Sequence, residues 1–257
     1  MPKVYLSPAY HYWNPCAVAG CDETTHNNLY LDVLEPYLAA CGIQYKRGPR
    51  RTPKSGEDGD ALMLQAVRES DAWGADVHYV SHTNAANGKA TGTHIFCYDA
   101  NRNSTGYKAC REVLDVLGPV TPGAPDVVRA YPALYEVKHP AAPTVYIEVD
   151  FHDVPAVAAW IIASTTVIGE AIAKGLCAAL GVPFVESTNA PEPVPVPVQP
   201  AQAETVQAAP SIGELQNNIK EHQNQLNNIN SQINSLQDEQ DLVQEKIDDL
   251  NAEIINT

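Results

Sequence analysis

The alternation of apolar and polar positions divides the first 187 residues into strand-like and helix-like segments. Runs of β-branched and aromatic residues predict strands, and apolar side chains three or four positions apart predict helices. The predicted strands span 3–6, 43–46, 77–81, 93–98 and 144–149, and the predicted helices span 23–40, 59–73, 107–117 and 155–180. Because strands alternate with helices, we expect an α/β domain with a mostly parallel, twisted sheet flanked by helices.

A different pattern begins after residue 210. Apolar residues recur at spacings of three and four from Ile212 to Ile254, and Ser211 with Glu214 forms a capping-box pattern before them. Six heptads in one register predict a C-terminal coiled-coil helix over 211–257. Ile at most a positions and Leu at half of the d positions favour self-association as a parallel dimer. The alternative is one amphipathic helix that docks on the first domain.

A Pro-rich segment joins the two patterned regions. Residues 188–210 contain six Pro and no apolar side chain larger than Val, which predicts an extended linker. All 18 aromatic residues lie at or before Phe184, so the remaining tail lacks the side chains of an ordinary globular core. The sequence therefore predicts three parts, which are a globular domain over 1–187, the linker over 188–210 and the coiled coil over 211–257.

The chain is acidic, with a formal net charge of −15 from 31 Asp and Glu against 16 Lys and Arg. Phosphate binding needs clustered Lys and Arg, so we expect no nucleic-acid partner and no attraction to an anionic membrane. No run approaches 18 consecutive apolar residues, and we therefore expect no membrane insertion. The N-terminus has no signal-peptide pattern, which predicts synthesis in the cytoplasm and free thiols for the six scattered Cys.

Four candidate chemical groups fall at predicted strand ends or at a helix start. His11 follows the first strand, Glu23 opens the first helix, His82 follows strand 77–81, and Glu148 lies near the end of strand 144–149. Two His and one carboxylate around an open position form a catalytic zinc set, with a further carboxylate for proton transfer. The spacing alone does not separate this set from His residues that only form hydrogen bonds in loops.

Four sequence blocks occur in a set order along residues 2–182. They are KVYLSPAYH, DETTHNNLYLDVLEPYLAACG, VHYVSHTNAANGKATGTHIFCY and TVYIEVDFHDVPAVAAWI. In this order they resemble the zinc-dependent N-acetylmuramoyl-L-alanine amidases of the amidase-3 type, in the form found in phage endolysins. Each block alone is a weak signal, whereas the four together are specific.

The resemblance implies a Zn2+ cofactor and assigns its ligands. His11 matches the His that ends the family's first strand, Glu23 the acidic residue that opens the next helix, and His82 the His of an H-x-N-A segment. Glu148 matches the catalytic carboxylate of an (I/V)-E-x-x-F strand end, which takes a proton from water and passes it to the departing amine. The implied activity is hydrolysis of the amide between N-acetylmuramic acid and L-alanine in bacterial peptidoglycan.

One departure from the family pattern leaves the first ligand open. The family usually has a Gly-His-Gly turn after the first strand, whereas the sequence here is SPAYH and no Gly flanks His11. His26 is the rival ligand, because it follows Glu23 by three residues and shares its helix face. Two further residues are candidates for orienting the ligands or lining the cleft: Asn84 and His152.

The resemblance also implies a biological setting. We expect a phage endolysin or cell-wall lysin that acts on the bacterial cell wall after release by lysis or by a holin-type route. The tail has no aromatic ring to stack on sugar, so we do not expect it to bind the wall itself. Self-association through 211–257 would instead raise avidity by linking catalytic domains that each hold the wall. Two other functions stay open: a non-catalytic wall-binding scaffold, and a metallopeptidase that cuts within the stem peptide.

Overall fold

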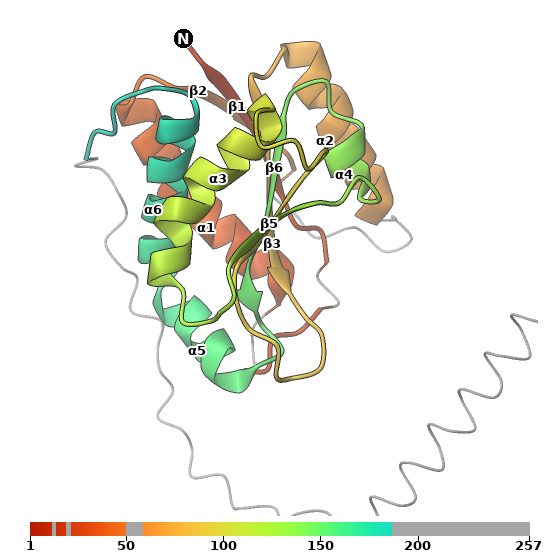
Figure 1. Ribbon diagram of the computed structural model, residues 1–257, viewed down its shortest axis with the longest axis vertical. Helices are drawn as coiled ribbons and strands as arrows, with labels where there is room; N and C mark the ends of the chain where they lie inside the picture. The colour runs from red at the N-terminus through yellow and green to blue at the C-terminus, as the bar shows by residue number, and fades with distance from the viewer. Residues whose placement is uncertain (12–13, 19–21, 50–58, 187–257) are drawn as a thin grey trace, which may run out of the picture. The chain divides into compact units, whose positions relative to one another are not determined.

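The computed structural model describes residues 1–11, 14–18, 22–49 and 59–186 (Figure 1). These ranges include all the strands and helices that the first 187 residues were expected to form. The predicted linker over 188–210 and the predicted coiled coil over 211–257, with its dimer, lie outside the described residues. They stay predictions from the sequence.

A six-stranded sheet forms the centre of the domain, in the order β2-β1-β3-β6-β4-β5. Strands β1, β2, β3 and β6 are parallel to one another, whereas β4 runs antiparallel to β6 and parallel to β5. The predicted α/β class with a mostly parallel sheet is therefore confirmed. The strands are β1 Lys3–Pro8, β2 Gln44–Arg47, β3 Val77–Asn84, β4 His94–Cys97, β5 Val127–Ala130 and β6 Thr144–Phe151.

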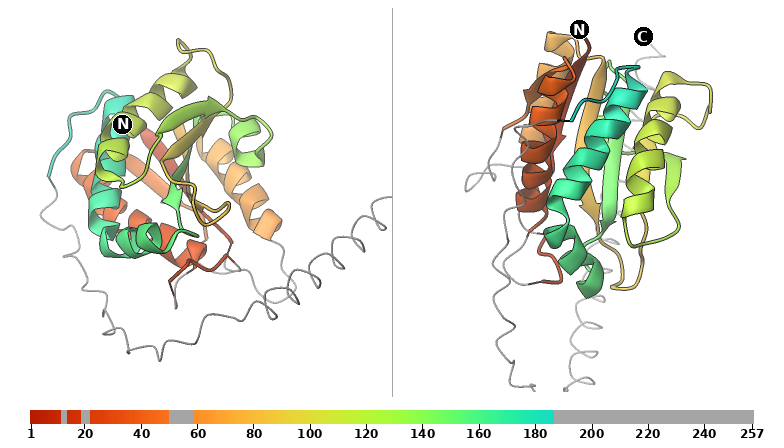
Figure 2. Two further views of the ribbon diagram at one scale, coloured as in Figure 1. Left: turned by 60° about the horizontal axis from the view of Figure 1, so that its bottom comes forward. Right: turned by 90° about the vertical axis from the view of Figure 1, so that its left-hand side faces the viewer.

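Helices cover both faces of the sheet. They are α1 Glu23–Ala40, α2 Gly59–Trp73, α3 Thr105–Leu117, α4 Tyr135–Lys138, α5 Pro155–Ala163 and α6 Thr165–Ala179, with a short 3-10 helix at Gly118–Val120. Helices α1, α6 and α3 lie side by side over one face, and α2 and α4 lie on the other (Figures 1 and 2). Strand β5 and helix α4 are short elements that the sequence pattern did not predict.

The alternation along the central strands separates the main core from the opposite face. On β6, Val145, Ile147 and Val149 belong to the main core beneath α1, α3 and α6. Successive strand residues point to opposite faces, so Tyr146 and Glu148 point to the side of α2 and α4. Tyr146 packs there in a smaller apolar cluster that includes a residue of α4. The candidate Glu148 therefore shares the more polar face of the sheet.

Two glycines of α6 allow close packing of the helix layer that carries α1. A Cβ added at Gly169 would lie 2.6 Å from the Cβ of Val33 on α1, and one at Gly175 would lie 2.5 Å from the Cα of Val113 on α3. Real Cβ atoms do not approach other atoms this closely, so a larger residue would push the helices apart. This packing fixes α1, whose first residue is Glu23.

The prediction of one helix over 155–180 is wrong. The segment forms α5 and α6, which are bent by 75° at Ser164. Ser164 has non-helical dihedral angles, and the hydroxyl of Thr165 donates to the carbonyl of Ile162, so side-chain hydrogen bonding competes with the helix there. Among the described helices, none alone is long and apolar enough to cross a membrane, and only this bent pair passes by length and composition.

Among the described cysteines, the prediction of free thiols is wrong for Cys16. Cys16, in the segment between β1 and α1, is disulfide-bonded. A disulfide stabilises a stretch with few apolar contacts mainly by restricting the unfolded chain, and Cys16 belongs to a small satellite cluster beside α5. Cys41, Cys97, Cys110 and Cys177 are free. The prediction rested on the expected compartment, which says nothing about local geometry.

Candidate active site

Three candidate side chains from separate elements converge at the carboxyl ends of β1 and β3. His11 follows β1, Glu23 is the first residue of α1, and His82 lies on β3. The Nδ1 atom of His82 is 2.7 Å from Oε1 of Glu23, and Nδ1 of His11 is 3.3 Å from Oε2. One donor atom from each residue lies within 4.8 Å of the others. Within the described ranges, no other three His, Cys, Asp or Glu residues form such a group.

Several neighbours fix the carboxylate of Glu23 in place. Asp22 caps α1 by accepting a hydrogen bond from the backbone N–H of Thr25 at 2.8 Å. The side-chain amide of Asn14 donates to Oε2 of Glu23 at 2.9 Å, and the backbone N–H of Thr83 donates to Oε1 at 3.2 Å. Only 2 % of the Glu23 side chain is exposed, against 41 % of His11. The group is therefore rigid on the Glu23 side and open to solvent on the His11 side.

The same contacts set the charge of the group. Burial alone would raise the pKa of Glu23, but the charge of His82 and hydrogen bonds from His11, His82 and Asn14 bring the pKa well below its ordinary value. The hydrogen bond with Glu23 raises the pKa of His11, against the opposite effect of burial. Glu23 is therefore an anion at neutral pH, which is the form that binds a metal ion.

Glu148 lies beside this group on the neighbouring strand. Strand β6 pairs with β3 so that Glu148 is opposite His82. Its Oε2 atom is buried and has no hydrogen-bond partner among the described residues. Burial, followed by the negative charge of Glu23, raises the pKa of Glu148 well above its ordinary value. A carboxyl group with a raised pKa and an unpaired oxygen suits proton transfer near neutral pH.

The donor set fits a catalytic metal. Two imidazole nitrogens and one carboxylate are ligand types that zinc takes in catalytic sites, where a fourth position stays open for water or substrate. The unpaired oxygen of Glu148 next to the set gives that position a partner for proton transfer. The arrangement of His11, Glu23 and His82 is therefore chemically suited to a zinc ion.

The other predicted residues lie around the group without joining it. His26, the rival ligand, is buried, and its Nδ1 atom has no hydrogen-bond partner within the described residues. Nδ1 of His152 is 2.9 Å from the hydroxyl oxygen of Thr83, whose backbone contacts Glu23. The side chain of Asn84 instead accepts a hydrogen bond from the next backbone N–H, at Ala85.

Sequence reasoning missed residues that hold the group in position. Asn14 and Thr83 bind the carboxylate of Glu23. Their only sequence signal is that Asn14 lies three positions after His11 and Thr83 lies one position after His82. The ring of Tyr146 on β6 stacks on His82, with centroids 4.7 Å apart and an angle of 12° between the planes. That contact depends on strand pairing, which the sequence pattern does not specify.

A cavity of about 240 Å³ opens beside His11 and His82, on the face of the sheet that α2 and α4 cover. Its walls come from the end of β1, from α2, from β3 and β6, and from the segment that enters α4. The residues that line it are Tyr10, His11, Asp60, Met63, His82, Ala133, Leu134, Tyr135, Glu136 and Tyr146. A substrate with its reacting bond at the two His residues would extend into this cavity.

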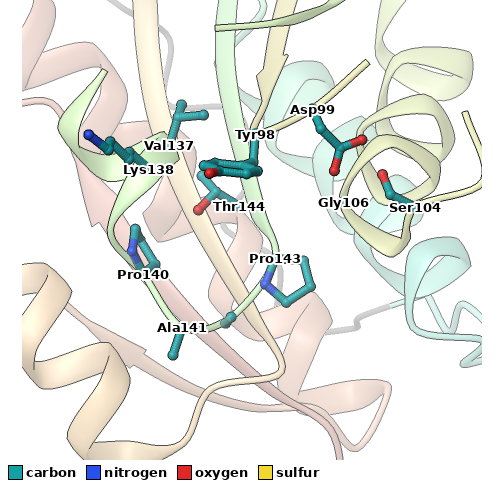
Figure 3. A pocket seen from close by; sticks show the side chains of 11 residues that line it. Tyr98, Asp99, Ser104, Gly106, Val137, Lys138, Pro140, Ala141, Pro143 and Thr144 are labelled. Carbon is teal, nitrogen blue, oxygen red and sulfur yellow. The ribbon is translucent and has the colours of Figure 1, made fainter. Parts of the chain in front are cut away.

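A second cavity of about 320 Å³ lies at the start of β6, away from the converging group (Figure 3). Figure 3 shows Tyr98 beside Thr144, with Asp99 and Ser104 on the side of α3 and Lys138 on the side of α4. It shares no residue with the group of His11, Glu23 and His82. The candidate active site is therefore the first cavity and the group beside it.

Comparison with known structures supports the fold assignment. The catalytic domain of CwlV, an N-acetylmuramoyl-L-alanine amidase from Bacillus (Paenibacillus) polymyxa var. colistinus, matches 71% of this chain and 100% of its own, with 15% identity and a TM-score of 0.61. The catalytic domain of the CD27L endolysin, which targets Clostridia Difficile, matches 69% of this chain and 98% of its own, with 17% identity and a TM-score of 0.57. At these identities the likeness shows the fold alone.

A third solved structure has the same fold, and a sequence model identifies the family. The N-acetylmuramoyl-L-alanine amidase AmiC2 of Nostoc punctiforme matches 70% of this chain and 97% of its own, with 14% identity and a TM-score of 0.58. No curated protein matches the sequence. The sequence model of the N-acetylmuramoyl-L-alanine amidase family matches residues 5–178, which is more than half of the chain. The chain belongs to this family.

Proposed function

We propose that this member of the N-acetylmuramoyl-L-alanine amidase family hydrolyses the amide between N-acetylmuramic acid and L-alanine in peptidoglycan, with a zinc ion held by His11, Glu23 and His82. The observation that supports this proposal most directly is the convergence of those three side chains next to the unpaired Glu148. The family match over residues 5–178 supports this reaction class.

The described residues prepare the site for hydrolysis of an amide, which is a poor electrophile. When bound, zinc acts as a Lewis acid and lowers the pKa of a coordinated water to about 7. Asn14 and Thr83 hold the Glu23 carboxylate, and the Tyr146 ring restricts the orientation of the His82 imidazole. The ligands are therefore held in place before substrate arrives, so little reorganisation is needed during the reaction.

Glu148 carries the proton through the reaction. Its Oε2 atom accepts a proton from the attacking water, and the raised pKa of the carboxyl group favours its holding that proton. Glu148 then donates the proton to the nitrogen of L-alanine, which leaves as an amine while the lactyl carboxylate stays on the sugar. Proton transfer of this kind typically contributes 10²–10⁴-fold to the rate.

The wider role follows from the sequence and the family. We infer that the protein is a phage endolysin or related cell-wall lysin that acts on the bacterial wall. The heptad pattern over 211–257 supports self-association as a coiled-coil dimer. Two linked catalytic domains would stay on a polymeric substrate longer than one, without any new contact.

The decisive experiment is product analysis of peptidoglycan digested by the full-length protein. Free amino groups on L-alanine together with intact glycan strands are expected. New amino termini inside the stem peptide would instead support a metallopeptidase, and wall binding without products would support a scaffold. A strong chelator should stop the reaction, and added zinc should restore it.

A further inference from the structure

The cavity beside the candidate zinc site is positioned to receive part of the substrate. His11 and His82 form one wall, and Met63 and Asp60 of α2 form another. A substrate whose scissile amide reaches the two His residues must place its neighbouring groups in this space. The side chains that line the cavity should therefore influence which substrates are hydrolysed.

Glu136 of α4 is a buried carboxylate in the lining of this cavity. Only 3 % of Glu136 is exposed, yet it lines the cavity. The hydroxyl of Ser7 donates to Oε1 of Glu136 at 2.6 Å, and Nε2 of His78 lies 3.0 Å from the same oxygen. Oε2 has no hydrogen bond within the described residues, and no Lys or Arg there forms an ion pair with it. One oxygen is therefore held by β1 and β3, and the other is left for a ligand.

Because Oε2 is unpaired and Glu136 lines the cavity, a donor or a positive charge that enters the cavity can reach this oxygen. The contacts of Ser7 and His78 explain how Oε1 is satisfied and how α4 is fastened to the sheet. They do not use Oε2. Oε2 is therefore available to an incoming group that donates hydrogen bonds.

The charge of the cavity indicates what that group is. Glu136 lines the cavity with one unpaired carboxylate oxygen, and no Lys or Arg is among the described residues that line it. The remaining walls are largely apolar or aromatic, including Met63, Leu134 and Tyr146. An unpaired carboxylate oxygen in a largely apolar cavity favours a cationic hydrogen-bond donor carried on an alkyl chain. In a peptidoglycan stem peptide, the free amine of the diamino acid has this chemistry.

We propose that this cavity binds the amine-bearing side chain of the stem peptide's diamino acid, with Glu136 as the charged partner of the ammonium group. The inference rests on the proposed function and specifies which substrates that function prefers. Glu136 acts in recognition, while the chemistry stays with the group around Glu148. A muropeptide whose side-chain amine is blocked should therefore be a poorer substrate.

The test compares two soluble substrates with the full-length, zinc-loaded protein. One is N-acetylmuramoyl-L-alanyl-D-isoglutaminyl-L-lysine, and the other carries an acetyl group on the lysine side-chain amine. We expect kcat/KM to be at least about tenfold higher for the free amine, because a charge-assisted hydrogen bond is lost on acetylation. In Glu136→Gln the ratio should fall towards one, whereas Asp99→Asn, in the second cavity, should keep the ratio of the wild type.

The outcomes separate this inference from the proposed function. Equal kcat/KM for the two substrates in the wild type overturns it, and this measurement does not depend on whether the Glu136 variant folds. A full preference for the free amine in a folded Glu136→Gln protein also overturns it. If both substrates are cut only within the peptide, or neither is cut, the proposed function itself is wrong and the inference falls with it.

Discussion

Replacing Glu148 by Gln tests the centre of the proposed mechanism. The substitution keeps the shape of the side chain but removes its ability to accept a proton. Glu148 lies opposite His82, and its Oε2 has no hydrogen-bond partner among the described residues. We expect hydrolysis to fall by about 10²–10⁴-fold, which corresponds to roughly 3–5 kcal/mol in the activation barrier.

The same substitution should leave the fold intact. Burial and the charge of Glu23 raise the pKa of Glu148 above its ordinary value of 4.5, so in the metal-free protein its ionised form is less favourable folded than unfolded. That penalty is absent at pH values below about 4 and grows as the pH rises. Gln removes the penalty but buries an amide without a partner, which costs about 1–3 kcal/mol. The two effects oppose each other, so Tm at neutral pH should change by less than about 4 °C.

The assay measures release of L-alanine amino groups from peptidoglycan, together with bound zinc and Tm. Glu112→Gln is the matched control, because Glu112 is exposed on α3 and far in sequence from the site. The control should behave as the wild type in all three measurements. Wild-type turnover in Glu148→Gln would remove Glu148 from the mechanism, and loss of both zinc and fold would show that the residue is structural.

Three further predictions concern the metal, the helix layer and the tail. His11→Ala should lose zinc by elemental analysis while His26→Ala keeps about one zinc per chain, and the reverse result would make His26 the ligand. Gly175→Ala should lower the free energy of unfolding by about 1–3 kcal/mol in urea titrations, because its Cβ would meet the α3 backbone. Gly106→Ala should not, because its Cβ would only make an ordinary contact with Pro143, at 4.0 Å. Light scattering should find residues 1–187 monomeric and the full chain dimeric, and a monomeric full chain would exclude the coiled coil.

The parts of the fold that the sequence predicted are those set by local signals. Helix α1 has its predicted bounds, since Asp22 caps its start and Gly42, with a φ of +71°, follows its end. The break at Ser164 was missed because the apolar pattern continues across it, and only the local hydroxyl geometry reveals the bend. Strand β5 and helix α4 have four residues each, too few for a periodic signal.

The candidate site also contains residues that the sequence identifies and residues that only the structure reveals. His11, Glu23, His82 and Glu148 could be named from strand ends and from the order of the sequence blocks, because chain direction places such residues at one edge of a parallel sheet. Glu136 could not be named from the sequence, since it meets Ser7 across 129 positions and lies in an element without a pattern. Contacts of this kind depend on how the segment before β6 folds back over the sheet.

The proposed zinc ligands and the proposed recognition residue lie on different structural elements. The proposed zinc ligands and Glu148 are carried by β1, β3, β6 and the start of α1, which are fixed by the sheet and by the helix layer behind it. The proposed recognition residue is carried by a four-residue helix whose carboxylate holds it to β1 and β3 through a single oxygen. A change at Glu136 therefore acts on the cavity wall and on the hydrogen bonds with Ser7 and His78, whereas the helix layer behind the sheet makes no use of it. In the proposed functions, separate elements carry the selection of stem peptides and the hydrolysis of the amide.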